Sequence, residues 1–208
     1  MITDPWFYVA AVPAVLLFGI AKGGFGGGLG VLAVPLMALV ISPLQAAAIL
    51  LPILCLMDLV GLWAYRGRWV WPELRILVPA SMIGILAGTL LFGFMSAAAV
   101  RIIVGIVAIV FTLHYVYSMR HRHDSALPHF SPAVGMAAGA AGGFTSFIAH
   151  SGGPPISMYL LRRPLDRTDF VATTVLLFAA INYVKLLPYG WLGQLSAGNL
   201  VTSLVLAP

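Results

Sequence analysis

The sequence predicts an all-α polytopic membrane protein, and its composition, segment lengths and charge placement support this prediction. Of the 208 residues, 61% are hydrophobic and 8% are charged, with a mean hydropathy of +1.03, whereas soluble domains carry about 25% charged residues. So few charged side chains cannot cover a water-facing surface. The sequence shows no sustained period-two alternation of the kind found in transmembrane β-barrels. The chain is therefore expected to form about seven to eight hydrophobic helical segments.

The first half begins with a broken pair of apolar runs. Runs over 6–21 and 31–41 flank the stretch KGGFGGGLG, which extends from Lys22 to Gly30 and contains six glycines in nine residues. Each run is shorter than the ~20 residues of a transmembrane helix. We therefore expect two half-helices that enter the membrane and return to the same side, followed by long helices over 44–65, 76–95 and 102–117.

The second half repeats this order after the polar loop SMRHRHDSALPHFSP. An apolar run over 133–149, the break HSGGPP and a short run over 156–161 precede a long run over 170–189 and a last apolar stretch. The triplet Gly-Gly-Phe of 23–25 returns at 142–144. We interpret 1–118 as a first membrane repeat, 119–131 as a cytoplasmic polar loop, and 132–208 as a second repeat that looks truncated.

Charge placement predicts the orientation of these segments. With the N-terminus outside, on the periplasmic side, the segment order brings most arginines to the inside: Arg66, Arg68, Arg75, Arg120, Arg122, Arg162, Arg163 and Arg167. This asymmetry is what the positive-inside rule requires. The first break is then entered from outside and the second from inside, so the repeat is inverted. Inverted repeats with broken helices are typical of secondary transporters.

The same residues argue against several other classes of protein. The net charge of +5 arises from cations in short loops, so it does not indicate nucleic acid binding. Cys55 is the only cysteine, which rules out an internal disulfide or a multi-cysteine metal site. Nothing holds the histidines of the polar loop in a ligand geometry, so neither a metal nor a cofactor is expected. The first ten residues lack the basic region of a signal peptide and are expected to belong to the mature chain.

The two breaks together predict an anion site. The second half-helix of each pair presents free N–H groups and a partial positive charge at its N-terminal end, and glycine allows a ligand to approach the backbone. Lys22 would add a positive charge, and Ser146 and Ser151 would add hydroxyl donors. The alternative is that the glycines serve close helix packing, because Gly24 and Gly28 fit a small-xxx-small pattern.

Ionisable residues inside the apolar runs are functional candidates because they are unfavourable in a bilayer. Asp58 and His150 are candidates for carrying a coupling proton, and His150 has a suitable ordinary pKa of about 6.5. Asp58 could instead form a structural pair with a lysine. Lys185 lies close to Pro188 and Tyr189, so it is expected to extend to the membrane interface.

An enzymatic function is not expected. An intramembrane serine hydrolase needs a base within hydrogen-bond reach of its serine, and adjacent residues such as His150 and Ser151 do not face each other on a helix. The glycine stretch also lacks the spacing of a nucleotide-binding loop.

Over nearly its whole length the chain resembles the TauE/SafE family of sulfite exporters, also called the 4-toluenesulfonate uptake permease family. The stretches that carry the resemblance are KGGFGGGLGVLAVPLMALVISPLQAAA and AGGFTSFIAHSGGPPISMYLLRRPLDRTDFVATT. Matched by position, the family motifs fall on Gly24, Gly26, Gly28, Pro35, Gly143, Ser146, Gly152, Gly153, Pro154 and Thr173. His150 departs from the pattern, since a small or apolar residue is common there.

The resemblance implies a bacterial inner-membrane carrier for small sulfur-containing or organic anions, such as sulfite or sulfonates. The bilayer, the anion and a coupling proton would then be its partners. A passive anion channel of the same fold and a non-transport membrane scaffold are the alternatives. The family pattern also implies a longer chain, so this chain is expected either to lack its last one or two helices or to be a naturally short member. The sequence leaves open which anion moves, in which direction, and in what oligomeric state.

Overall fold

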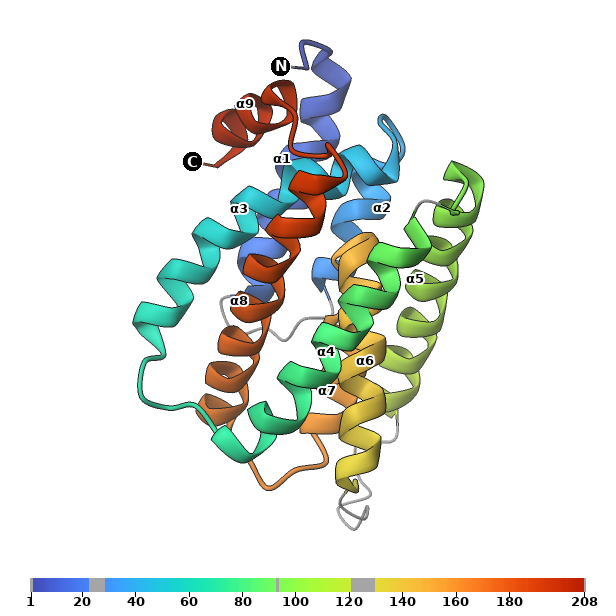
Figure 1. Cartoon of the computed structure of the whole chain (residues 1–208). Coiled ribbons are helices and arrows are strands. Elements are labelled where there is room, and N and C mark those ends of the chain that lie inside the picture. Colours follow the sequence, from blue (N-terminus) through green and yellow to red (C-terminus); the bar gives the residue numbers. More distant parts are fainter. Residues whose placement is uncertain (1, 23–28, 93, 121–129, 208) are drawn as a thin grey trace.

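Long helices make up most of the computed structural model, which describes residues 2–22, 29–92, 94–120 and 130–207 (Figure 1). Within these ranges the chain forms helices and no strands. In chain order the helices are α1 (Pro5–Ile20), the 3-10 turn η2 (Leu29–Leu32), α2 (Ala33–Met37), α3 (Pro43–Ala64), α4 (Trp71–Phe92), α5 (Ala97–Arg120), α6 (Pro132–Ala149), α7 (Gly153–Leu160), α8 (Arg167–Trp191) and α9 (Ala197–Leu206). By length and composition, α3, α4, α6 and α8 can each cross a membrane. The predicted all-α polytopic fold is confirmed.

Capping residues and prolines explain where several helices begin. Asp4 precedes Pro5 at the start of α1, and its carboxylate accepts a hydrogen bond from the Trp6 N–H at 3.0 Å. Proline suits the first helical position because that position needs no N–H donor. A serine followed by a proline begins both α3 and α6, and Asp166 caps α8. The predicted starts at 44 and 133 therefore lie close to the observed ones.

The predicted start of the run over 76–95 is wrong, because α4 begins earlier, at Trp71. Glu73 and Arg75 suggested a polar loop. Glu73 nevertheless lies in the first turn of α4, and its side chain is buried. Its carboxylate accepts hydrogen bonds from Tyr159 at 2.8 Å and from Arg163 at 2.7 Å. A buried carboxylate with two donors is compatible with the first turn of a helix.

Two broken helix pairs enter the fold from opposite ends (Figure 1). Helix α1 runs inward from the end that holds the N-terminus, and η2 and α2 return towards it. Helix α6 runs inward from the other end, and α7 folds back along it, so that Gly135 of α6 faces Tyr159 of α7. Arg163, just after α7, donates to the Phe130 carbonyl before α6 at 3.2 Å. Each pair thus leaves where it entered, as expected for an inverted arrangement.

Contacts between distant segments define the two ends of the bundle. At one end, the Ile2 N–H donates to the Thr202 hydroxyl of α9 at 3.2 Å. At the other end, Arg68 of the α3–α4 loop pairs with Asp166 at 2.9 Å and with Asp169 at 3.0 Å. Such exposed pairs stabilise a fold little, but they show that two of the arginine-bearing loops share one end.

Between the ends, α3 is central, and residues 46–51 are fully buried on every face.

Helices α4 and α6 touch backbone to backbone through glycines. A methyl group added to Gly84 would lie 2.0 Å from the Ala140 carbonyl oxygen, and one added to Gly143 would lie 2.1 Å from that of Ser81. No side chain fits at such distances. Gly143, one of the positions implied by the family motif, therefore serves close helix packing.

Candidate functional site

A cavity of about 470 Å³ lies where the two broken pairs meet α3 and α8. Its polar lining includes Lys22 after α1, Asp58 of α3, Asn182 of α8, and Ser146 and His150 at the end of α6. Most of the remaining wall is apolar or aromatic, including Phe18, Leu54, Met57, Val60, Phe170, Val175 and Phe178. A few convergent polar groups in an apolar cavity of this size are typical of small-molecule sites.

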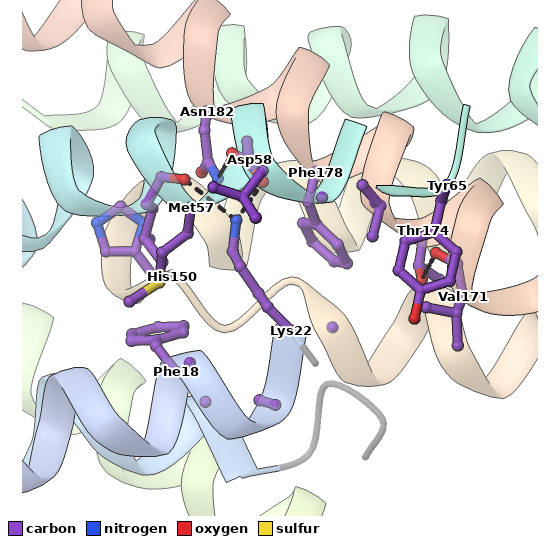
Figure 2. A pocket seen from close by; sticks show the side chains of 18 of the residues that line it. Phe18, Lys22, Met57, Asp58, Tyr65, His150, Val171, Thr174, Phe178 and Asn182 are labelled. Carbon is purple, nitrogen blue, oxygen red and sulfur yellow. Dashed lines mark hydrogen bonds and ion pairs between the residues drawn. The ribbon is translucent and has the colours of Figure 1, made fainter. Parts of the chain in front are cut away.

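Lys22 forms an ion pair with Asp58 at the edge of this cavity. Figure 2 shows the lysine side chain extending from the end of α1 towards α3. Its ammonium pairs with Asp58 Oδ1 and donates to the Leu54 carbonyl at 3.2 Å. Asn182 donates to Asp58 Oδ2 at 2.7 Å. The side chain of Asp58 is 2% exposed and that of Lys22 is 21% exposed. Asp58 therefore compensates the charge of Lys22.

A second polar cluster surrounds Lys185, whose side chain is fully buried on α8. Its Nζ donates to the backbone oxygen and the hydroxyl of Ser146, both at 3.0 Å, and lies 2.7 Å from His150 Nδ1. His150 Nε2 lies 2.8 Å from the Ala47 carbonyl oxygen. A carbonyl oxygen only accepts hydrogen bonds, so Nε2 carries a hydrogen. The Lys185–Ser146–His150 cluster thus joins α8 to the second break.

The backbone of His150 is in the left-handed region, with φ of 50°. This conformation is unfavourable by roughly 1–2 kcal/mol for residues other than glycine. The imidazole lies near Phe18 and Tyr189, with ring centroids 6.3 and 6.4 Å away. A strained residue persists when its surroundings fix it, and such residues cluster at functional sites.

His150→Gly is expected to destabilise the protein by about 1–3 kcal/mol, although glycine relieves the backbone strain. The variant leaves the Ala47 carbonyl and one N–H of Lys185 without partners. The melting temperature in detergent measures the effect. His150→Asn is the matched control, because asparagine tolerates a positive φ and keeps a polar side chain. A glycine variant more stable than the wild type would show that the imidazole contacts contribute nothing.

Several of the predicted site residues line the cavity, namely Lys22, Asp58, Ser146, His150 and Gly153. Others lie elsewhere. Ser151 is buried and donates to the Ala149 carbonyl at 3.0 Å. Thr173 accepts a hydrogen bond from the Val70 N–H at 3.1 Å, outside the cavity lining. Gly152 packs on α6, where an added methyl group would lie 2.4 Å from the Gly142 oxygen.

Some of the predictions fall outside the described residues, namely those for Gly24, Gly26 and Gly28 and for most of the polar loop. The arrangement that a serine hydrolase would need is not formed by Ser151 and His150. The serine hydroxyl donates to a backbone carbonyl, and both imidazole nitrogens contact other groups.

Sequence reasoning missed Lys185 and Asn182 as site residues. The expectation that Lys185 extends to the membrane interface is wrong, because its side chain is 0% exposed. Pro188 suggested a nearby helix end, but α8 continues past it to Trp191. The available signal was a lysine inside an apolar run long enough to cross a membrane.

Comparison with known proteins places this geometry in a wider context. Residues 11–208 match the profile of a family described as Sulfite exporter TauE/SafE. Comparisons with curated proteins and with solved structures gave no match. The matched range includes both helix breaks and every residue that lines the cavity.

Proposed function

The chain belongs to the sulfite exporter TauE/SafE family of membrane transporters, and on this basis we propose that it is a secondary carrier for a small anion. The cargo would be a sulfur-containing or organic anion such as sulfite or a sulfonate, moved across the bacterial inner membrane. The cavity between the two breaks would hold it. Alternating access would follow from rocking of the two halves around this fixed site.

The charge balance of the cavity carries the proposal. Lys22 and Asp58 neutralise each other, whereas Lys185 contacts the neutral partners Ser146 and His150. Among the described residues, one positive charge therefore remains in excess behind the cavity wall. A buried charge without a counter-ion is unfavourable, and an anion in the cavity would supply one.

Ser146 would link Lys185 to the anion through hydrogen bonds. Its hydroxyl oxygen accepts from the Lys185 ammonium at 3.0 Å, and Ser146 lines the cavity. A hydroxyl that accepts a hydrogen bond can still donate its own hydrogen. The principal counter-charge of the anion would thus be Lys185, with Lys22 held by Asp58 until the site rearranges.

The proposed orientation has the N-terminus in the periplasm and the arginine-bearing loops in the cytoplasm. The contacts of Arg68 with Asp166 and of Arg163 with Phe130 support it, because they gather three inter-helix loops at one end. An excess of cationic loops at one end is the pattern of cytoplasmic loops.

Thermal melting of the purified protein in detergent tests the proposal. The panel comprises sulfite, sulfate, thiosulfate, sulfoacetate, taurine and small carboxylates. A ligand at 100 times its Kd stabilises the folded state by about 2.7 kcal/mol, so one class is expected to raise the melting temperature. The shift should disappear in Lys185→Met and persist in Arg75→Gln, since Arg75 is exposed. Cooperative melting without a shift from any of these anions would contradict the proposal.

A further inference from the structure

Lys185 and His150 share one proton, and this proton gives the pair its positive charge. The distance between Nζ and Nδ1 is 2.7 Å, which leaves room for a single hydrogen between the two nitrogens. His150 Nε2 keeps its own hydrogen for the Ala47 carbonyl. The pair is therefore either an ammonium beside a neutral imidazole or an amine beside an imidazolium. In both forms it carries one positive charge, and loss of the shared proton makes it neutral.

The charged and titratable groups around this pair come from three elements. Asp58 of α3 and Lys22 after α1 act electrostatically on Lys185, the titratable thiol of Cys55 also belongs to α3, and Lys22 also acts on His150. On α8 itself, Tyr189 stacks near the imidazole but donates its hydroxyl to the Phe147 carbonyl at 2.6 Å. The two carboxylate oxygens of Asp58 already accept hydrogen bonds from Lys22 and Asn182. Among the described residues, no carboxylate pairs with Lys185 or His150, so the pair carries its positive charge without a counter-ion.

The Lys185 ammonium lies at the C-terminal end of α6. It binds the Ser146 backbone oxygen in the last turn of α6, at the negative end of the helix dipole. In broken-helix carriers, such carbonyl-bearing ends coordinate the coupling cation. Here a tethered ammonium occupies that position, so a free sodium ion is not needed there.

We infer that anion binding in the cavity and protonation of the Lys185–His150 pair are linked, so that the carrier moves its anion together with a proton. This inference rests on the proposed function. When the cavity is empty, the excess charge is unfavourable and the proton is released more easily. When an anion occupies the cavity, the proton is held. By linkage, the proton strengthens anion binding by the same factor.

The first experiment uses the wild-type protein in detergent and two monovalent probes, methanesulfonate and acetate, whose charges stay constant between about pH 6 and pH 9. Adding a probe to weakly buffered protein should raise the pH of the solution, with uptake of up to one proton per anion bound. The dissociation constant should increase with pH and approach a tenfold increase per unit above the pH at which the empty pair loses its proton.

Variants identify the group that holds the proton. Lys185→Arg places a permanent charge at this position, because arginine stays protonated in proteins. Whatever the affinity of this variant, its dissociation constant should depend little on pH. Cys55→Ser removes a titratable group of α3 without unpairing Lys22 from Asp58, so this variant should keep a dissociation constant that increases with pH. Loss of the dependence in Cys55→Ser, or its persistence in Lys185→Arg, would assign the proton elsewhere and overturn the inference.

The outcomes separate the inference from the proposed function. If the wild type binds neither probe and no anion of the melting panel at any pH, the proposed function fails, and the inference falls with it. If an anion binds with the same affinity across the pH range and without proton uptake, the cavity remains an anion site and only the inference is overturned. This wild-type measurement decides the question even if Lys185→Arg does not fold.

Discussion

Asp58→Ala is expected to destabilise the protein by about 3 kcal/mol, since removal of one partner of a buried ion pair leaves the other uncompensated. Lys22 would lose its counter-ion, and Asn182 would lose the acceptor of its 2.7 Å hydrogen bond. Both losses fall on side chains at the contact between α1, α3 and α8. The melting temperature in detergent, compared with that of the wild type, measures the effect.

A double variant provides the control for this prediction. Removing both charges with Lys22→Met and Asp58→Leu leaves no uncompensated ion, so most of the stability should return. If Asp58→Ala melts like the wild type, the pair is not part of the folded core. If the double variant is as unstable as Asp58→Ala, the loss comes from packing rather than from charge.

Gly143→Ala is expected to cause a loss of about 3 kcal/mol or more, because overpacking a close helix contact displaces the backbone. The new methyl group would lie 2.1 Å from the Ser81 carbonyl oxygen, and that oxygen belongs to α4 and has no rotamer to change. Helices α4 and α6 would have to separate along their contact. Size-exclusion profiles and melting curves in detergent measure the damage.

Gly190→Ala is the matched control for this prediction. Gly190 also lies in a helix, but an added methyl group would meet nothing within 4 Å. Alanine favours a helix over glycine by roughly 0.5–1 kcal/mol, so this variant should be as stable as the wild type or slightly more stable. If Gly143→Ala behaves in the same way, the close contact of α4 and α6 does not limit stability.

The helix order could be predicted from the sequence because prolines and glycines mark where helices begin and break. Pro43 and Pro132 start α3 and α6 at nearly the expected positions. Two other residues suggested helix limits that differ from the observed ones. Pro188 lies inside α8 and does not end it, since neighbouring groups can satisfy the freed carbonyl. Glu73 belongs to α4, because Tyr159 and Arg163 satisfy its carboxylate.

The candidate site was predictable only in part. Lys22, Asp58 and His150 could be identified as costly ionisable residues, and a pairing of Asp58 with a lysine was among the alternatives. Which residues meet could not be predicted, because Asp58 and Asn182 are 124 positions apart and meet only after α3 packs on α8. The glycines illustrate the same limit. Sequence alone does not tell whether a ligand or another helix approaches Gly143, and the structure places α4 there.

Counterflow in proteoliposomes tests whether this chain carries an anion through an alternating-access site. Vesicles are loaded with the unlabelled anion identified by melting, and a trace of labelled anion is added outside. A carrier is expected to accumulate label transiently above its equilibrium level, and Lys185→Met should abolish this accumulation. Label that only equilibrates would indicate a passive channel, and vesicles that take up no more label than protein-free ones would indicate a protein that does not transport the anion. Either result would contradict the account.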